Sequence, residues 1–130
     1  MPVTYEADTY YRFSPFARNW IATSGVMNFC ERHRCFWVLD TVASYAPTLA
    51  KRKGIDYFLI VTVEVNPDKT ALFTIKQEIR DALTEGEEVL IRQVIDHTDL
   101  TESLKFWAIN ESPGDYDHKH QTVVLLTDEY

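Results

Sequence analysis

The side chains best suited to chemistry lie within residues 35–46. A helix turns about 100° per residue, which places Trp37, Asp40, Thr41 and Ser44 within one arc and leaves the rest of the segment almost entirely apolar. A carboxylate and a hydroxyl beside an indole could anchor and wall a ligand pocket. These residues could equally be structural, with Asp40 accepting hydrogen bonds from a loop or a helix end, because a buried carboxylate needs such partners.

Arg92, on a later segment, is a candidate to complete this pocket from elsewhere in the chain, and His97 is an alternative from the same region. We therefore predict Trp37, Asp40, Ser44 and Arg92 as ligand-binding residues. One observation separates the functional from the structural interpretation. It is whether Asp40 lines an open cavity or is sealed by hydrogen bonds.

Cys30, His33 and Cys35 form a second group with reactive side chains. Thiolate and imidazole are zinc ligands, but a closed site needs a fourth ligand and this spacing matches no zinc motif. A Cys–His nucleophilic pair is chemically conceivable. Two cysteines without an export signal do not make a disulfide framework, so we expect reduced thiols, a cytoplasmic location and no bound metal.

Residues 115–120 place two carboxylates and two imidazoles, His118 and His120, in one polar stretch. We interpret it as a solvated connection between strands, with a weak divalent-metal site or a pH-sensitive loop as the alternative. Gly-rich phosphate loops, nucleophile elbows and HExxH motifs are not found in the sequence. We therefore predict no cofactor.

The charge balance bears on the partners. Of 130 residues, 20 are acidic and 13 are basic, which gives a formal charge of −7. This argues against a general nucleic-acid binder, because such proteins place Lys and Arg against phosphates. No apolar run approaches the roughly 20 residues of a membrane helix, so we expect no membrane partner.

Helices are expected early in the chain. Pro15 suits the first turn of a short helix running to about Ala22, and Ser24 is the expected N-cap of the next. Residues 35–46 are apolar nearly all round, which indicates a buried central helix. Pro47 marks either its end or a new helical turn.

Later residues alternate between apolar and polar, which is typical of strands. Helices followed by strands predict an α+β fold. We expect a single domain, residues 1–130, with N-terminal helices packed on one face of a four- to five-stranded antiparallel meander. The expected strands span residues 57–65, 70–79, 89–95, 104–109 and 121–127.

Residues 36–47 read FWVLDTVASYAP. This stretch resembles aromatic-W-L-L-D-x-I-A-S-Y-x-P, the signature of a family of small uncharacterised bacterial proteins also found on phage and other mobile elements. Three shorter stretches are similar to that family in the same order: residues 10–12, 23–26 and 92–99. The resemblance implies a small intracellular α+β protein and no particular activity.

Together these patterns favour a non-enzymatic binding or interaction module. The aromatic residues between positions 10 and 20 are candidate interface anchors for a protein partner, and a homodimer through a sheet face or edge is compatible with the pattern. The alternative is a small enzyme or ligand-binding domain that uses Trp37, Asp40 and Ser44.

Overall fold

The computed structural model describes residues 10–15, 17, 19–52, 58–78, 86–110 and 122–129. In these ranges the chain forms two helices and seven strands, so the predicted α+β class is confirmed. The elements are β1 (Tyr10–Arg12), β2 (Trp20–Thr23), α1 (Ser24–His33), α2 (Phe36–Ala50), β3 (Phe58–Val65), β4 (Ala71–Glu78), β5 (Glu87–Ile95), β6 (Leu104–Asn110) and β7 (Thr122–Leu126).

The sheet is larger and less regular than the predicted meander. Its strand order is β1-β2-β7-β6-β3-β4-β5, and β2 runs parallel to β7 while the other neighbours are antiparallel. The two additional strands are β1 and β2, which come before the helices in the chain. The prediction of four or five strands was therefore wrong, because the predicted meander included only strands that follow the helices.

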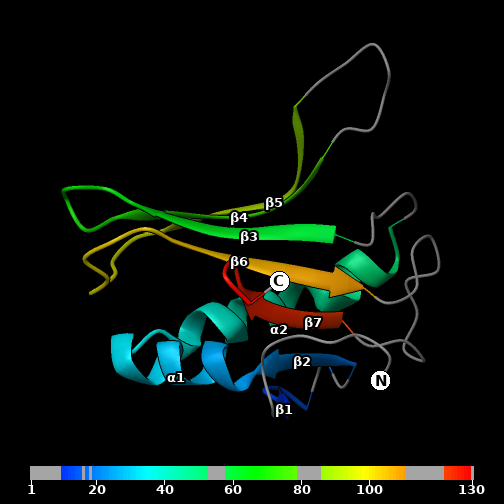
Figure 1. The fold of residues 1–130 in the computed structure, drawn as a ribbon. Helices are drawn as coiled ribbons and strands as arrows, with labels where there is room; N and C mark the ends of the chain where they lie inside the picture. The colour runs from blue at the N-terminus through cyan, green and yellow to red at the C-terminus, as the bar shows by residue number, and fades with distance from the viewer. Residues whose placement is uncertain are drawn as a thin grey trace.

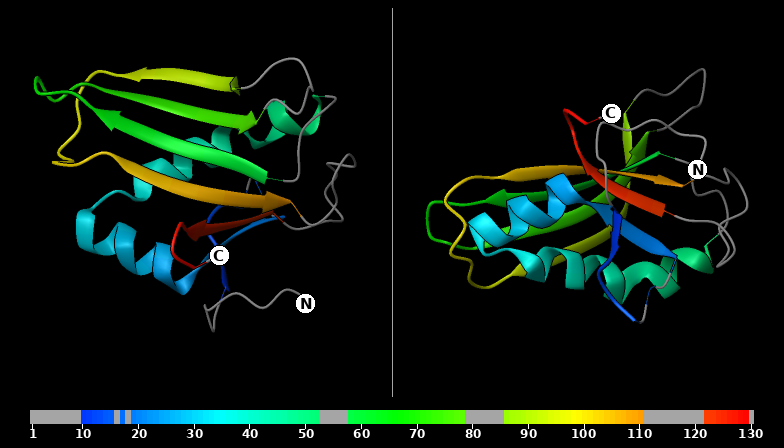
Figure 2. Two further views of the ribbon diagram at one scale, coloured as in Figure 1. Left: turned by 45° about the horizontal axis from the view of Figure 1, so that its top comes forward. Right: turned by 60° about the horizontal axis from the view of Figure 1, so that its bottom comes forward.

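Both helices cover the same face of the sheet (Figure 1), and α2 passes behind the strands in the left view of Figure 2. The main core fills the space between these layers, with Val38 and Leu39 of α2 packed with Val61, Phe73 and Phe106 of the sheet. A smaller apolar cluster on β2, β6 and β7 consists of Ile21, Ile109, Val123 and Leu125, with Trp107 and Phe58 against it.

The start of α1 differs from the prediction. Residues 20–23 form β2 instead of the end of a short helix, and the N-cap is Thr23 instead of Ser24. The Thr23 hydroxyl accepts a hydrogen bond from the Val26 backbone N–H at 3.2 Å, which satisfies one of the free N–H groups of the first turn.

The end of α1 forms a tight turn into α2. Arg34 takes a left-handed conformation (φ 54°), and the backbone N–H of Cys35 donates to the Cys30 carbonyl at 2.9 Å. A second bond joins the Arg34 N–H to the Glu31 carbonyl. These two bonds define a Schellman motif, in which the residues at the positions of Cys30 and Cys35 commonly make an apolar contact.

The predicted central helix is confirmed as α2. It continues through Pro47 to Ala50, and its six buried residues are all apolar. Tyr45 joins this helix to the edge of the sheet: its hydroxyl donates to the Gln93 side chain at 2.6 Å, and its ring stacks with Phe73 at 6.2 Å. The helix is thereby held to β5 as well as to the centre of the sheet.

Replacing Tyr45 with phenylalanine should test this attachment. The substitution keeps the ring on Phe73 and removes the hydroxyl, so we expect the free energy of unfolding to fall by about 0.5–1.5 kcal/mol. Chemical denaturation followed by circular dichroism measures the change. Since the bond needs both partners, Gln93→Ala should add little to Tyr45→Phe in the double variant; fully additive losses would contradict the contact.

None of the helices in the described part of the chain is long and apolar enough to cross a membrane.

Candidate functional site

Two of the four predicted ligand residues share one hollow, which we call the α2 hollow. Asp40 and Ser44 lie one turn apart on the exposed side of α2 and border a space of about 480 Å³. The other lining residues are Phe13, Ser14, Pro15, Ala43 and Pro47. The helical spacing used in the sequence prediction explains why positions 40, 43, 44 and 47 line one side of it.

Trp37 and Arg92 do not join this hollow. Trp37 is half-buried against the main core, and its carbonyl accepts a hydrogen bond from the Thr41 hydroxyl at 2.7 Å. Arg92 lies on the opposite face of the sheet, because its neighbour Gln93 contacts α2 and successive strand residues face opposite sides. Arg92 therefore does not complete a pocket with Asp40, as the sequence had led us to expect.

Asp40 is exposed, and no hydrogen bond within the described residues seals its carboxylate. Ser44 is also exposed, and its hydroxyl donates to the Thr41 carbonyl at 2.6 Å. The carboxylate therefore stands at the edge of a mostly apolar hollow. This chemistry suits a ligand with a cationic group and an apolar body.

The cysteine group separates into two environments. Cys30 and Cys35 are fully buried in the main core, whereas His33 is exposed on α1. Among the described residues, no three His, Cys, Asp or Glu side chains gather as a metal site would require. The stretch 115–120 with its two histidines lies outside the described residues.

Both thiols should resist reagents while the protein is folded. The hydrogen bond with Cys35, together with burial, raises the pKa of the Cys30 thiol well above its ordinary value, so it stays protonated and weakly nucleophilic. The same bond lowers the pKa of the Cys35 thiol, and this thiol is protected because its side chain is fully buried. We expect a thiol-specific chromogenic disulfide to react slowly with the native protein and rapidly with the denatured protein. Rapid reaction of either thiol before unfolding would contradict the packing.

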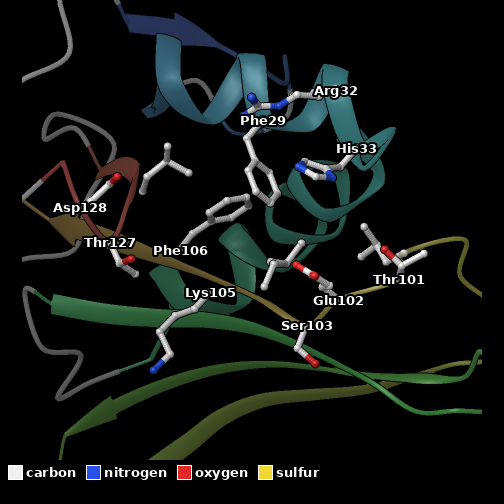
Figure 3. A pocket seen from close by; sticks show the side chains of 13 residues that line it. Phe29, Arg32, His33, Thr101, Glu102, Ser103, Lys105, Phe106, Thr127 and Asp128 are labelled. Atoms are coloured by element: carbon white, nitrogen blue, oxygen red, sulfur yellow. The ribbon is translucent and has the colours of Figure 1, made fainter.

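A larger hollow of about 610 Å³ lies where the second half of α1 meets the sheet; we call it the α1 hollow. In Figure 3, Phe29 of α1 and Phe106 of β6 point toward one another at its centre. Their rings meet edge to face with centroids 5.6 Å apart. The apolar floor is formed by Phe29, Leu100, Leu104, Phe106 and Leu126.

The rim of the α1 hollow carries both signs of charge. Arg32 and His33 occupy the last turn of α1, and the His33 ring lies 4.3 Å from that of Phe29. Glu102 and Asp128 border the space from other segments, as Figure 3 shows. An apolar floor with a few charged groups around it is the usual composition of a binding pocket.

The α1 hollow was not predicted from the sequence. The spacing of Phe29 and His33 places them on one face of a helix, but residues 100–106 and 126–128 join them only through the strand order of the sheet. A local signal existed in Arg32 and His33, two polar residues beside an aromatic one at the end of the helix. Nothing in their spacing indicated which later segments would face them.

Fold and hollows together define a two-layer α+β protein with a mostly antiparallel seven-stranded sheet covered on one face by two helices. The chain belongs to the Family of unknown function DUF6876, whose family model matches residues 3–130. The predicted membership of an uncharacterised family is confirmed, and that family carries no assigned function. The searches of curated proteins and of solved structures found no significant match.

Proposed function

We propose that this protein is a non-enzymatic binding module that receives an apolar side chain of a protein partner in the α1 hollow. The observation that carries the proposal is the edge-to-face pair Phe29–Phe106 at the bottom of a space of about 610 Å³. Large apolar anchors that fill such pockets dominate the energy of many protein interfaces. The space can accommodate an aromatic or long aliphatic side chain.

The charges on the rim would set the direction of the bound segment. Arg32 and His33 stand on the α1 side, while Glu102 and Asp128 face them from the sheet side. A peptide with an acidic residue on one side of its anchor and a basic residue on the other fits this arrangement. Such complementarity contributes more to specificity and association rate than to affinity.

The cellular setting is also a proposal. The resemblance of residues 36–47 to the signature of a bacterial family supports a bacterial, cytoplasmic protein. Because that family also occurs on phage and mobile elements, a host protein is the partner we favour. The formal charge of −7 favours a partner that has a basic surface.

Selection from a displayed library of random peptides tests the binding module directly. The enriched peptides should share an apolar anchor, and synthetic copies should bind with an affinity measurable by fluorescence anisotropy. Thr101→Trp fills the α1 hollow from its exposed rim and should abolish binding. Thr48→Trp, on the exposed side of α2 away from the hollow, is the matched control and should bind normally.

Two results would refute this function. One is a library that yields no peptide above background. The other is a selected peptide whose affinity is unchanged by Thr101→Trp and by Phe29→Ala. Circular dichroism melting of each variant establishes that it is folded before its affinity is compared.

The α2 hollow supports a second candidate, a small enzyme or ligand-binding domain, because Asp40 and Ser44 line an open space there. Asp40→Asn should leave the free energy of unfolding within about 0.5 kcal/mol, since the carboxylate is exposed. A thermal-shift screen of small amines and guanidines would supply ligands. A ligand that stabilises the native protein but not Asp40→Asn supports this candidate; a large loss of stability in the variant would instead support a structural role.

A further inference from the structure

The strand β5 forms one border of the sheet. It is last in the strand order, and β4 is its only neighbour among the described strands. In the left view of Figure 2, β5 is the uppermost strand of the sheet. An outer strand presents a row of backbone N–H and C=O groups on its free side, where another strand can pair with them. With nine residues, β5 is long enough to offer such a border.

The two halves of β5 differ in regularity. The register against β4 shifts once, where Leu90 has no partner residue. A bulge of this kind twists an edge strand and discourages further pairing at that point. From Ile91 to Ile95, in contrast, every residue has one partner on β4. These five residues, which we call the regular half of β5, are therefore the part of the border that can accept another strand.

The side chains of the regular half alternate between the two faces of the sheet. Gln93 faces α2, because its side chain accepts the hydrogen bond from Tyr45, so Arg92 and Val94 face the open side. Val94 is 64% exposed, more than any other large apolar side chain of the described residues. Asp96 is exposed at the next alternate position, directly after the strand. Among the described residues, neither Arg92 nor Asp96 has an ion pair.

The order of cation, valine and anion is complementary to itself when the strand is reversed. Two antiparallel copies of β5 related by a two-fold axis at Val94 place Arg92 of each copy opposite the partner's Asp96. Both members of each pair face the open side, as directly opposed residues of antiparallel strands must. An axis at Gln93 or Ile95 would instead set Val94 against a charged side chain, and an axis at Arg92 would oppose like charges. Charge complementarity therefore selects one register.

We propose that this protein forms a two-fold symmetric homodimer in which the regular halves of β5 pair antiparallel and join the two sheets into one. Val94 packs against the partner's Val94 at the axis, and an ion pair between Arg92 and the partner's Asp96 lies on each side of it. Backbone hydrogen bonds and the covered valines supply the affinity. The exposed ion pairs fix the register more than they strengthen the complex.

This arrangement has two further consequences. The two-fold axis is perpendicular to the joined sheet, so the helices of both copies lie on the same face of it. The interface is also separate from the α1 hollow, which involves β6 and β7 at the other side of β3 and β4. Because a strand pair this short buries less surface than a standard interface, we expect a dimer in equilibrium with the monomer.

Sedimentation velocity over a range of protein concentrations tests the dimer. The native protein should change from monomer to dimer as its concentration rises, and no larger species should form, because a two-fold contact uses the border of both copies. Val94→Lys sets two ammonium groups against each other at the axis and should abolish the dimer. Val89→Lys is the matched control, since Val89 is an exposed valine of the same strand before the bulge. This variant should associate as the native protein does.

A mixture of two charge variants tests the register. Arg92→Asp and Asp96→Arg each place like charges at both flanking positions, so each variant alone should associate on the order of tenfold more weakly than the native protein. In an equimolar mixture, every acidic side chain of one variant faces a basic side chain of the other. A heterodimer should therefore form with the affinity of the native dimer, and a fluorescent label on one variant allows it to be measured.

Four results would overturn the proposal. The native protein remains monomeric at every concentration, or it grows beyond a dimer. Val94→Lys dimerises as the native protein does, or the mixture of charge variants associates no better than either variant alone. Circular dichroism melting of each variant establishes that it is folded before its association is compared.

Discussion

Replacing Trp20 with alanine is expected to lower the free energy of unfolding by about 3–5 kcal/mol, the usual cost of removing a fully buried large aromatic side chain. Trp20 has no exposed surface and belongs to the main core, although it begins a strand of only four residues. Natural domains are stable by about 5–15 kcal/mol. The substitution therefore removes a large share of the total, and urea denaturation followed by far-ultraviolet circular dichroism measures it.

Trp37 provides the comparison. It lies in the most distinctive stretch of the sequence, yet it is only half-buried against the core. Trp37→Ala should cost roughly half as much as Trp20→Ala or less, because less apolar surface returns to water. Equal losses, or a larger loss for Trp37, would show that Trp20 does not fill the core as described. Trp20→Phe, which retains a ring, should recover part of the stability.

The elements of the fold that could be predicted from the sequence are those marked by local patterns. The helix α2 was predictable because residues 35–46 are apolar nearly all round, which is the pattern of a buried helix. The hairpin of β3 and β4 was predictable because its alternation and its turn at residues 66–69 are local signals. Both predictions depended on residues that are close in the chain.

The strand β2 gives no such signal. All four of its residues are buried, so the alternation that marks a half-exposed strand is absent. It pairs with the short strand β1 on one side and runs parallel to β7 on the other, and β7 follows it by about a hundred residues. Pro15 upstream suggested a helix start instead. Tertiary contacts therefore determine that residues 20–23 form a strand. The sheet predicted without this strand had too few strands.

The candidate sites also differ in whether their residues are close in the chain or are brought together only by the strand order. Asp40 and Ser44 were brought together correctly because one turn of a helix separates them. Arg92 was placed with them although its strand turns it to the other face, and a shift of one residue is enough to reverse that orientation. The α1 hollow combines segments that only the strand order assembles, so no spacing within the sequence could have indicated it.

Glu129 connects the C-terminal end of the described chain to the start of α1 through hydrogen bonds. Its carboxylate accepts a hydrogen bond from the Thr23 hydroxyl at 2.7 Å and another from the Leu126 backbone N–H at 2.8 Å. A negative charge is favourable at this end of a helix because of the helix dipole. A methyl group on Gly25 would stand 2.6 Å from a carboxylate oxygen of Glu129, so the glycine leaves room for the carboxylate.

This geometry predicts that the effect of one substitution changes sign with its background. In the native protein, Gly25→Ala should displace the carboxylate and cost about 1–2 kcal/mol, since two charge-assisted hydrogen bonds are disturbed. With Glu129→Ala already present, the same change should stabilise by up to about 1 kcal/mol, because alanine is the better helix former. Denaturation of the four proteins in this cycle gives the coupling energy directly. If Gly25→Ala has the same effect in both backgrounds, Glu129 does not occupy the start of α1, and the C-terminal segment that borders the α1 hollow must be held in some other way.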